Sequence, residues 1–169
     1  MTVTEAIRKR RSIRKFVKDA KISKEQIDLL LEAAMRAPSA CNTRPWEFIV
    51  VQERAVLDSI RKAHPYTGML ETASLAIIVM ALPETQVKDI DRGYYPQDCG
   101  AATENILLQA LDLGLGTCWC GVYPKEHRIN DMQKILDTTG TPFCIIAVGV
   151  PDENPDPRGA FEPGKVRYI

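Results

Sequence analysis

Six of the eight residues from Arg8 to Lys15 are lysine or arginine, and a serine lies among them. The whole chain has 22 basic and 22 acidic residues, so the rest of the sequence is net acidic. Guanidinium groups, a hydroxyl and backbone N–H groups are the donors that a bound phosphate needs. A solvated basic surface or a nucleic-acid contact would have a similar composition. Ile13 and Phe16 interrupt the cations and would anchor the segment to a core, which favours a fixed anion site.

Two further segments hold groups suited to contacting a ligand. Residues 38–45, Pro-Ser-Ala-Cys-Asn-Thr-Arg-Pro, have the composition of a polar loop, and residues 116–121 form a strand end rich in small residues. Neither holds an obvious acid, base or nucleophile. The two histidines, His64 and His127, lie in separate segments without metal-ligand spacing, so the sequence predicts no metal site. Such a set suits a protein whose chemistry is supplied by a bound cofactor.

The five cysteines bear on the cellular compartment. Their number is odd and no Cys-x-x-Cys pair occurs, which predicts reduced thiols in a cytoplasmic protein. Cys118 and Cys120 are two apart on a predicted strand, a spacing too long for an easy disulfide, and we expect both to pack in the core. No apolar stretch is long enough to cross a bilayer and no signal peptide is present, so no membrane contact is expected.

The elements that must position these segments follow from caps and apolar periodicity. Thr2–Glu5 and Ser23–Gln26 read as capping boxes that open two helices. Alternation of helices and short strands predicts a single α/β or α+β domain over residues 1–169. Further helices are expected at 53–63, 97–113 and 124–137, and strands at 46–52, 75–82, 117–122 and 143–150.

Three predictions concern the second half of the chain. The helix at 97–113 is apolar around most of its circumference, so it should be buried in a core or a subunit interface and end at Gly114. Residues 83–96 are polar and should form a surface excursion. The proline-rich tail from Pro151 should wrap over the surface or over a neighbouring subunit.

Taken together and in order, several stretches resemble the flavin-dependent nitroreductase family in its compact, single-domain form. They are Arg10–Arg14 with Phe16, Ala37–Trp46, Asp98–Ala102, Leu113–Pro124 and Ile146–Pro151. The resemblance implies an α+β fold with a mostly antiparallel sheet flanked by helices. It also implies an intertwined homodimer with two FMN sites at the subunit interface.

The resemblance implies roles for individual residues as well. The phosphate and ribityl chain of FMN would be held by Arg10, Arg11, Ser12 and Arg14. The residues that reach the flavin from the partner subunit would be Pro38, Ser39, Ala40 and Asn42. Those along the isoalloxazine, with a backbone N–H near N5, would be Trp119, Cys120 and Gly121. A tail cation, Arg158 or Lys165, would complete the phosphate site.

Two features depart from the family pattern. Arg44 stands where relatives commonly carry glutamine, and it would either stabilise a reduced, anionic flavin or face solvent. The excursion at 83–96 is short, which predicts an open site with loose selectivity.

The function implied by the resemblance is that of an FMN-dependent oxidoreductase. NADH or NADPH would deliver a hydride to flavin N5, and a nitroaromatic, quinone or similar small acceptor would then be reduced at the same face by a ping-pong mechanism. No catalytic side chain is expected, because the chemistry takes place on the flavin. One alternative is a flavin-binding storage or sensor protein without NAD(P)H turnover. Another is a nucleic-acid-binding module that uses residues 8–15, which the acidic remainder of the chain disfavours.

Overall fold

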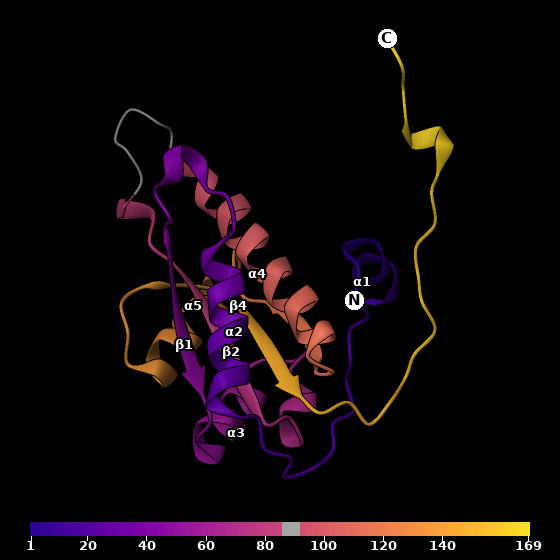
Figure 1. The fold of residues 1–169 in the computed structure, drawn as a ribbon. Coiled ribbons are helices and arrows are strands. Elements are labelled where there is room, and N and C mark those ends of the chain that lie inside the picture. The colour runs from indigo at the N-terminus through magenta and orange to yellow at the C-terminus, as the bar shows by residue number, and fades with distance from the viewer. Residues whose placement is uncertain (86–91) are drawn as a thin grey trace.

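The computed structural model describes residues 1–85 and 92–169, and it shows a sheet with helices packed around it (Figure 1). The helices are α1 (Val3–Lys9), α2 (Lys24–Met35), α3 (Arg54–Ala63), α4 (Tyr95–Asp112) and α5 (Glu126–Leu136). The strands are β1 (Trp46–Val51), β2 (Leu75–Ala81), β3 (Gly116–Gly121) and β4 (Thr141–Gly149). In these two ranges, no helix is both long and apolar enough to span a bilayer.

The strands pair antiparallel in the order β1-β2-β4-β3, so the α+β fold and the antiparallel sheet predicted from the sequence are confirmed. Strand β2 is buried along its whole length, as its unbroken apolar run requires. Side chains of α2 and α4 form the core on one face of the sheet, and those of α3 and α5 form the core on the other. Strand β3 lies at an edge, which leaves one side of its backbone open to other groups.

Local signals set the helix ends. The hydroxyls of Thr2 and Ser23 each accept from the backbone N–H three residues on, and the Glu5 and Gln26 side chains bond back, so both predicted capping boxes are confirmed. Helix α4 begins two residues before its predicted start, with Pro96 in its first turn where a missing N–H is harmless. It ends at Asp112, and Gly114 adopts a left-handed φ of 71° just beyond.

The segment of residues 10–17, which we call the N-terminal arm, is attached to the sheet at two points. The Ile13 N–H donates to the Thr117 carbonyl over 2.8 Å, and the Val17 N–H donates to the Val150 carbonyl over 2.9 Å. Ile13 and Phe16 are buried, as predicted. The Phe16 ring lies so close to Gly149 that a Cβ there would come within 2.6 Å of it. The arm can dock only because the end of β4 carries no side chain at that position.

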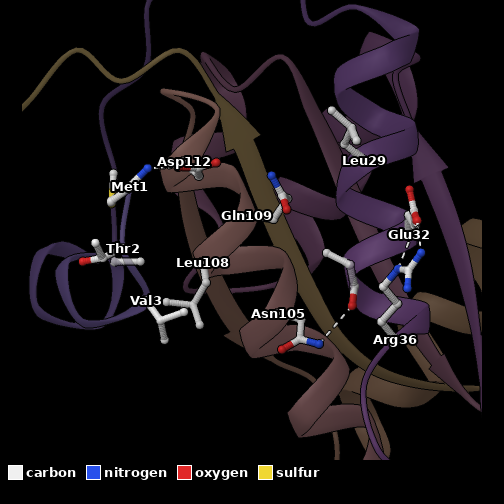
Figure 2. Close-up of a pocket in the computed structure, with 12 residues that line it drawn as sticks. Met1, Thr2, Val3, Leu29, Glu32, Arg36, Asn105, Leu108, Gln109 and Asp112 are labelled. Carbon is white, nitrogen blue, oxygen red and sulfur yellow. Dashed lines mark hydrogen bonds and ion pairs between the residues drawn. The ribbon is translucent and has the colours of Figure 1, made fainter.

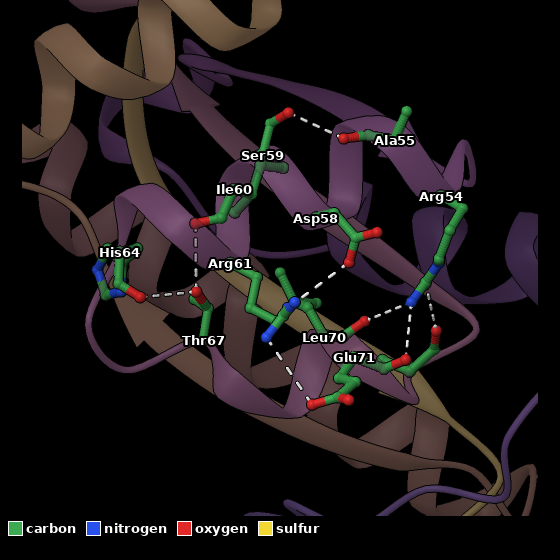
Figure 3. Close-up of polar contacts among 11 residues, drawn as sticks. Arg54, Ala55, Asp58, Ser59, Ile60, Arg61, His64, Thr67, Leu70 and Glu71 are labelled. Atoms are coloured by element: carbon green, nitrogen blue, oxygen red, sulfur yellow. Dashed lines mark hydrogen bonds and ion pairs between the residues drawn. The ribbon is translucent and has the colours of Figure 1, made fainter.

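A second attachment fixes the connection between α3 and β2 (Figure 3). The Arg54 guanidinium donates to three backbone carbonyls, those of Leu70, Glu71 and Ala73, over 2.7, 2.9 and 3.0 Å. Arg54 thereby holds the end of the loop at residues 64–70 against the start of its own helix. This matters because the same loop forms one wall of the candidate site.

The structure tests in part the predictions for the excursion at 83–96 and for the proline-rich tail. Of the excursion at 83–96, residues 86–91 lie outside the described residues, while 83–85 and 92–94 form short 3-10 turns. Pro151 pairs with Phe16, and the Asp152 N–H donates to the Lys15 carbonyl over 2.9 Å. After Pro155 the tail runs away from the sheet with its side chains exposed (Figure 1), so it does not wrap over the surface of its own subunit.

Candidate functional site

An open hollow lies against the edge strand β3, where the N-terminal arm, the loop at 64–70 and the strand meet. Its volume is about 530 Å³, which is enough for a planar, drug-sized ring system. We call it the edge hollow. Its lining residues are Arg14 from the arm, Pro65, Tyr66, Gly68 and Met69 from the loop, and Cys118, Trp119, Cys120 and Gly121 from β3.

The backbone of β3 presents polar groups to this hollow. The Thr117 carbonyl accepts from Ile13, and the Gly121 carbonyl accepts from His64, so both residues face away from β4. Alternation along an antiparallel strand gives Trp119, midway between them, the same orientation. Its N–H and C=O therefore point to the open edge. A flat ligand in the hollow would meet one donor and one acceptor there.

His64 connects the loop to the strand. Its Nε2 lies 3.0 Å from the Gly121 carbonyl, and its Nδ1 accepts the Tyr66 N–H over 3.3 Å. One ring nitrogen is thus a donor and the other an acceptor, which is the pattern of a neutral imidazole. Burial lowers the pKa of His64, with only the hydrogen bond to Gly121 opposing it. Arg128 lies beside it, donating to the same carbonyl over 3.1 Å and covering the Tyr66 ring.

The neutral state of His64 predicts a pH-dependent stability. Because its folded pKa lies below the unfolded value of about 6.5, the folded state binds fewer protons. The free energy of unfolding should therefore fall as the pH drops below about 6.5. Urea denaturation at several pH values should show this slope in the parent protein and lose it in His64→Gln. His127→Gln, which removes the exposed second histidine, should keep it; an unchanged slope in His64→Gln would contradict the assignment.

The two thiols on β3 are buried and contribute to the core, as predicted, and they also line the edge hollow. The Cys120 thiol donates to the Tyr66 carbonyl over 3.1 Å, which ties the strand to the loop. The neighbouring Cys120 side chain is the main cause that lowers the pKa of Cys118 to about 7. Burial opposes this shift, and the Arg14 charge and the Ser12 hydroxyl add to it. The Cys118 side chain and burial raise the pKa of Cys120.

The three arginines that were predicted to hold the phosphate and ribityl chain of FMN line two different hollows. Arg14 lines the edge hollow, while Arg10 and Arg11 line a smaller neighbouring one of about 150 Å³. Arg10 is ion-paired through Nε with Glu104 of α4, over 3.0 Å. The Arg11 Nε is buried without a hydrogen-bond partner in the described part of the chain. Ser12 lies between the hollows, with its backbone bridged to Thr117.

The loop that contains Pro38, Ser39, Ala40 and Asn42 lies elsewhere, beside the first turn of α4. The Ala40 N–H donates to the Asp98 carboxylate over 3.1 Å. Asn42 and Arg44 adopt left-handed φ values of 56° and 51°, a strained conformation for such residues. In one chain the loop does not line the edge hollow, and its contact with a flavin of the partner subunit stays a prediction.

Two predicted cations have other surroundings in this structure. The Arg44 guanidinium donates to the Met35 carbonyl over 3.2 Å and so caps the C-terminus of α2. Arg158 lies in the exposed tail, and Lys165 is paired with Glu162 over 2.8 Å. Their roles toward a cofactor stay predictions.

The contribution of Pro65, Tyr66, Gly68 and Met69 to the site was not predicted. Their composition is typical of a turn. The contacts of His64 and Cys120, which are 57 and 54 residues distant in sequence from their partners, bring this turn to β3.

Comparison with known proteins identifies the family of this chain. The model of the nitroreductase family matches residues 7–67 and 61–150. A provisionally named NADH dehydrogenase/NAD(P)H nitroreductase from Methanothermobacter thermautotrophicus is 44% identical over 168 residues, which covers 98% of this chain and 86% of the relative.

Solved structures show the same fold. An FMN-dependent nitroreductase from Clostridium difficile R20291 is 32% identical with a TM-score of 0.87, and the match covers 98% of each chain. A provisionally named nitroreductase from Desulfovibrio desulfuricans, solved in complex with FMN, is 28% identical with a TM-score of 0.84. That match covers 100% of this chain and 97% of the other. The chain is thus a member of the nitroreductase family.

Proposed function

We propose that residues 1–169 form one FMN-binding domain that oxidises NADH or NADPH and reduces nitroaromatic, quinone or similar small acceptors. The observation that carries the proposal is the edge hollow, in which Arg14 lies beside the open backbone edge of β3. The chain that forms this hollow is a member of the nitroreductase family. Bound FMN supplies the hydride and electron transfer. The chain's own part is to hold the flavin, orient it and admit one guest at a time.

The residues present fit FMN. A phosphate carries about two negative charges and is best held by guanidinium forks, and Arg14 offers one on the wall of the edge hollow. The unpartnered Arg11 Nε is a further donor, in the neighbouring hollow. The Ser12 hydroxyl would serve the ribityl chain. The Trp119 N–H, at the open edge, is suited to an acceptor nitrogen on the rim of the isoalloxazine.

A second copy of the chain is part of this proposal. Helices α1, α2 and α4 surround a hollow of about 450 Å³, with Val3, Leu29 and Leu108 beside it (Figure 2). Val3 is 73% exposed and Leu29 is 43% exposed, which is a high exposure for apolar side chains that line one hollow. The extended tail exposes Phe161 and Tyr168 as well. A symmetric homodimer would cover both surfaces.

The purified protein should be yellow and should release FMN, not FAD, on denaturation. The arm offers donors for a terminal phosphate, and the sequence contains no fingerprint for an adenine dinucleotide. Absorbance of the native protein and chromatography of the released flavin test this. A colourless protein that FMN cannot reconstitute would refute the proposal. A yellow protein that neither NADH nor NADPH bleaches would instead support flavin storage or sensing.

Steady-state kinetics should be ping-pong. With the flavin in the edge hollow, its one open face leaves room for one planar guest, so the nicotinamide must leave before the acceptor enters. Initial rates measured over a grid of NADH or NADPH and quinone concentrations should give parallel double-reciprocal lines, with several unrelated acceptors accepted. Intersecting lines would mean that donor and acceptor bind together.

A further inference from the structure

Arg128 is a cation beside the edge hollow that binding of FMN alone leaves unused. It lies in the first turn of α5 and contacts two residues that line the hollow. One terminal nitrogen donates to the Gly121 carbonyl over 3.1 Å, and the guanidinium carbon lies 5.3 Å from the centroid of the Tyr66 ring. The side chain is half-buried, so these contacts fix its position while part of the guanidinium stays accessible.

In the part of the chain that the structure describes, no acidic side chain pairs with Arg128. The acidic residues on the same helix nearest to it in sequence, Glu126 and Asp131, make no ion pair with it either. Its acceptor is the Gly121 carbonyl, which His64 also contacts, and its Nε is buried without a partner among the described residues. A guanidinium has five N–H donors. A fixed cation with spare donors beside a hollow is suited to an anionic group of a ligand.

Arg14 and Arg128 are associated with opposite ends of β3. The N-terminal arm bonds to the strand at Thr117, through the residue before Arg14, whereas Arg128 bonds to it at Gly121. These two points on the strand are roughly 13 Å apart at about 3.3 Å per residue. FMN has one phosphate, which the function proposed above assigns to Arg14. The second cation is therefore available to a group on the guest that enters beside the flavin.

We propose that Arg128 binds the phosphate next to the nicotinamide riboside of NADH or NADPH and is a specificity-determining residue for the hydride donor. The inference rests on the function proposed above. Gly121 lies roughly 7 Å along the strand from Trp119, a span similar to that between the nicotinamide ring and this phosphate in an extended nucleotide. NADH and NADPH both carry the phosphate, so Arg128 should favour both over donors that lack it.

The test compares two donors that differ only in this phosphate, the reduced forms of nicotinamide mononucleotide and nicotinamide riboside. Bleaching of the FMN-loaded protein in stopped flow measures the efficiency of each. In Arg128→Gln the ratio of mononucleotide to riboside efficiency should fall about 10- to 100-fold, because one charge-assisted hydrogen bond to phosphate is lost. The loss should appear in the concentration for half-maximal rate, and Arg128→Lys should lose less. Lys134→Gln, which removes an exposed cation in the last turn of α5, is the matched control and should keep the ratio.

Binding supplies a second readout that needs no turnover. The tetrahydro derivatives of the two donors have no hydride to transfer, so calorimetric titration measures their affinity alone. The mononucleotide derivative should bind the parent protein more tightly than the riboside derivative does. Arg128→Gln should remove most of this difference, and added salt should reduce it in the parent protein.

Three results would overturn the proposal. An unchanged ratio in Arg128→Gln is one, because a purely structural role for the contacts with Gly121 and Tyr66 would lower the efficiency of both donors together. A loss with NADPH that NADH does not share is another, because it would assign Arg128 to the 2′-phosphate. An FMN affinity that falls as far as in Arg14→Ala is the third, because it would place the flavin phosphate at Arg128.

The proposed function fails separately, if FMN does not bind or if no nicotinamide donor bleaches it. The titration with the tetrahydro derivatives then still decides whether Arg128 binds the phosphate. Equal affinities of the two derivatives for the parent protein would refute that contact.

Discussion

Replacing Arg14 with alanine should weaken FMN binding about 10- to 100-fold without unfolding the protein. Arg14 is exposed on the wall of the edge hollow, and its loss removes one charge-assisted hydrogen bond to phosphate, which contributes about 1.5–3 kcal/mol. Its backbone N–H still bonds to Glu153 in the variant, so the arm stays attached. Fluorescence titration of apoprotein with FMN measures the effect.

Two further variants sharpen this experiment. Arg8→Ala removes a cation from the same cluster at a position that does not line the hollow, so it should leave the FMN affinity nearly unchanged. Arg14→Lys keeps the charge and loses the planar fork, so its affinity should be intermediate. Equal titration curves for Arg14→Ala and the parent protein would refute the phosphate assignment. Equal losses in Arg8→Ala and Arg14→Ala would indicate a diffuse charge effect and no defined site.

Replacing Arg54 with methionine should lower the free energy of unfolding by about 2–3 kcal/mol, or the Tm by roughly 4–12 °C. The substitution keeps the aliphatic stem and leaves the carbonyls of Leu70, Glu71 and Ala73 without their shared donor. The loop that carries Tyr66 and Met69 would lose its attachment to α3. FMN affinity should therefore fall together with stability, although Arg54 does not line the hollow.

Arg61→Met is the matched control for this variant. Arg61 lies on the same helix and, among the described residues, makes two long ion pairs, with Asp58 over 3.5 Å and Glu71 over 3.8 Å (Figure 3). Such partly exposed pairs contribute less than about 1 kcal/mol. Urea denaturation of both variants measures the difference. A loss in Arg54→Met no larger than that in Arg61→Met would show that the three carbonyl contacts do not stabilise the loop.

The sequence predicts the features of this fold that depend on neighbouring residues. The caps at Thr2 and Ser23 and the end of α4 at Gly114 need only a few residues, so local composition identifies them. The burial of Ile13 and Phe16 was predictable because each is an apolar residue in a charged segment. The sheet order cannot be read in this way, because it depends on which strands meet after folding.

In the candidate site too, contacts between segments far apart in the sequence could not be predicted from local composition. The presence of Arg14 at the candidate site could be expected from charge and resemblance, but the pairing of Arg10 with Glu104 and of Arg44 with the Met35 carbonyl could not. Each of these contacts joins the arginine to an element outside the motif that contains it. A resemblance assigns a residue to a site, whereas the contacts of its side chain depend on the geometry of this particular chain.

The docking of the N-terminal arm has a consequence for the order of synthesis. The arm is synthesised before the residues that fix it, which are Thr117, Gly149 and Val150, far later in the chain. Until β4 has emerged and paired, Arg14 has no fixed position and the edge hollow has only part of its wall. If the chain binds FMN as proposed, the site would be complete only after β4 has been made, and cofactor loading would be a late step of maturation.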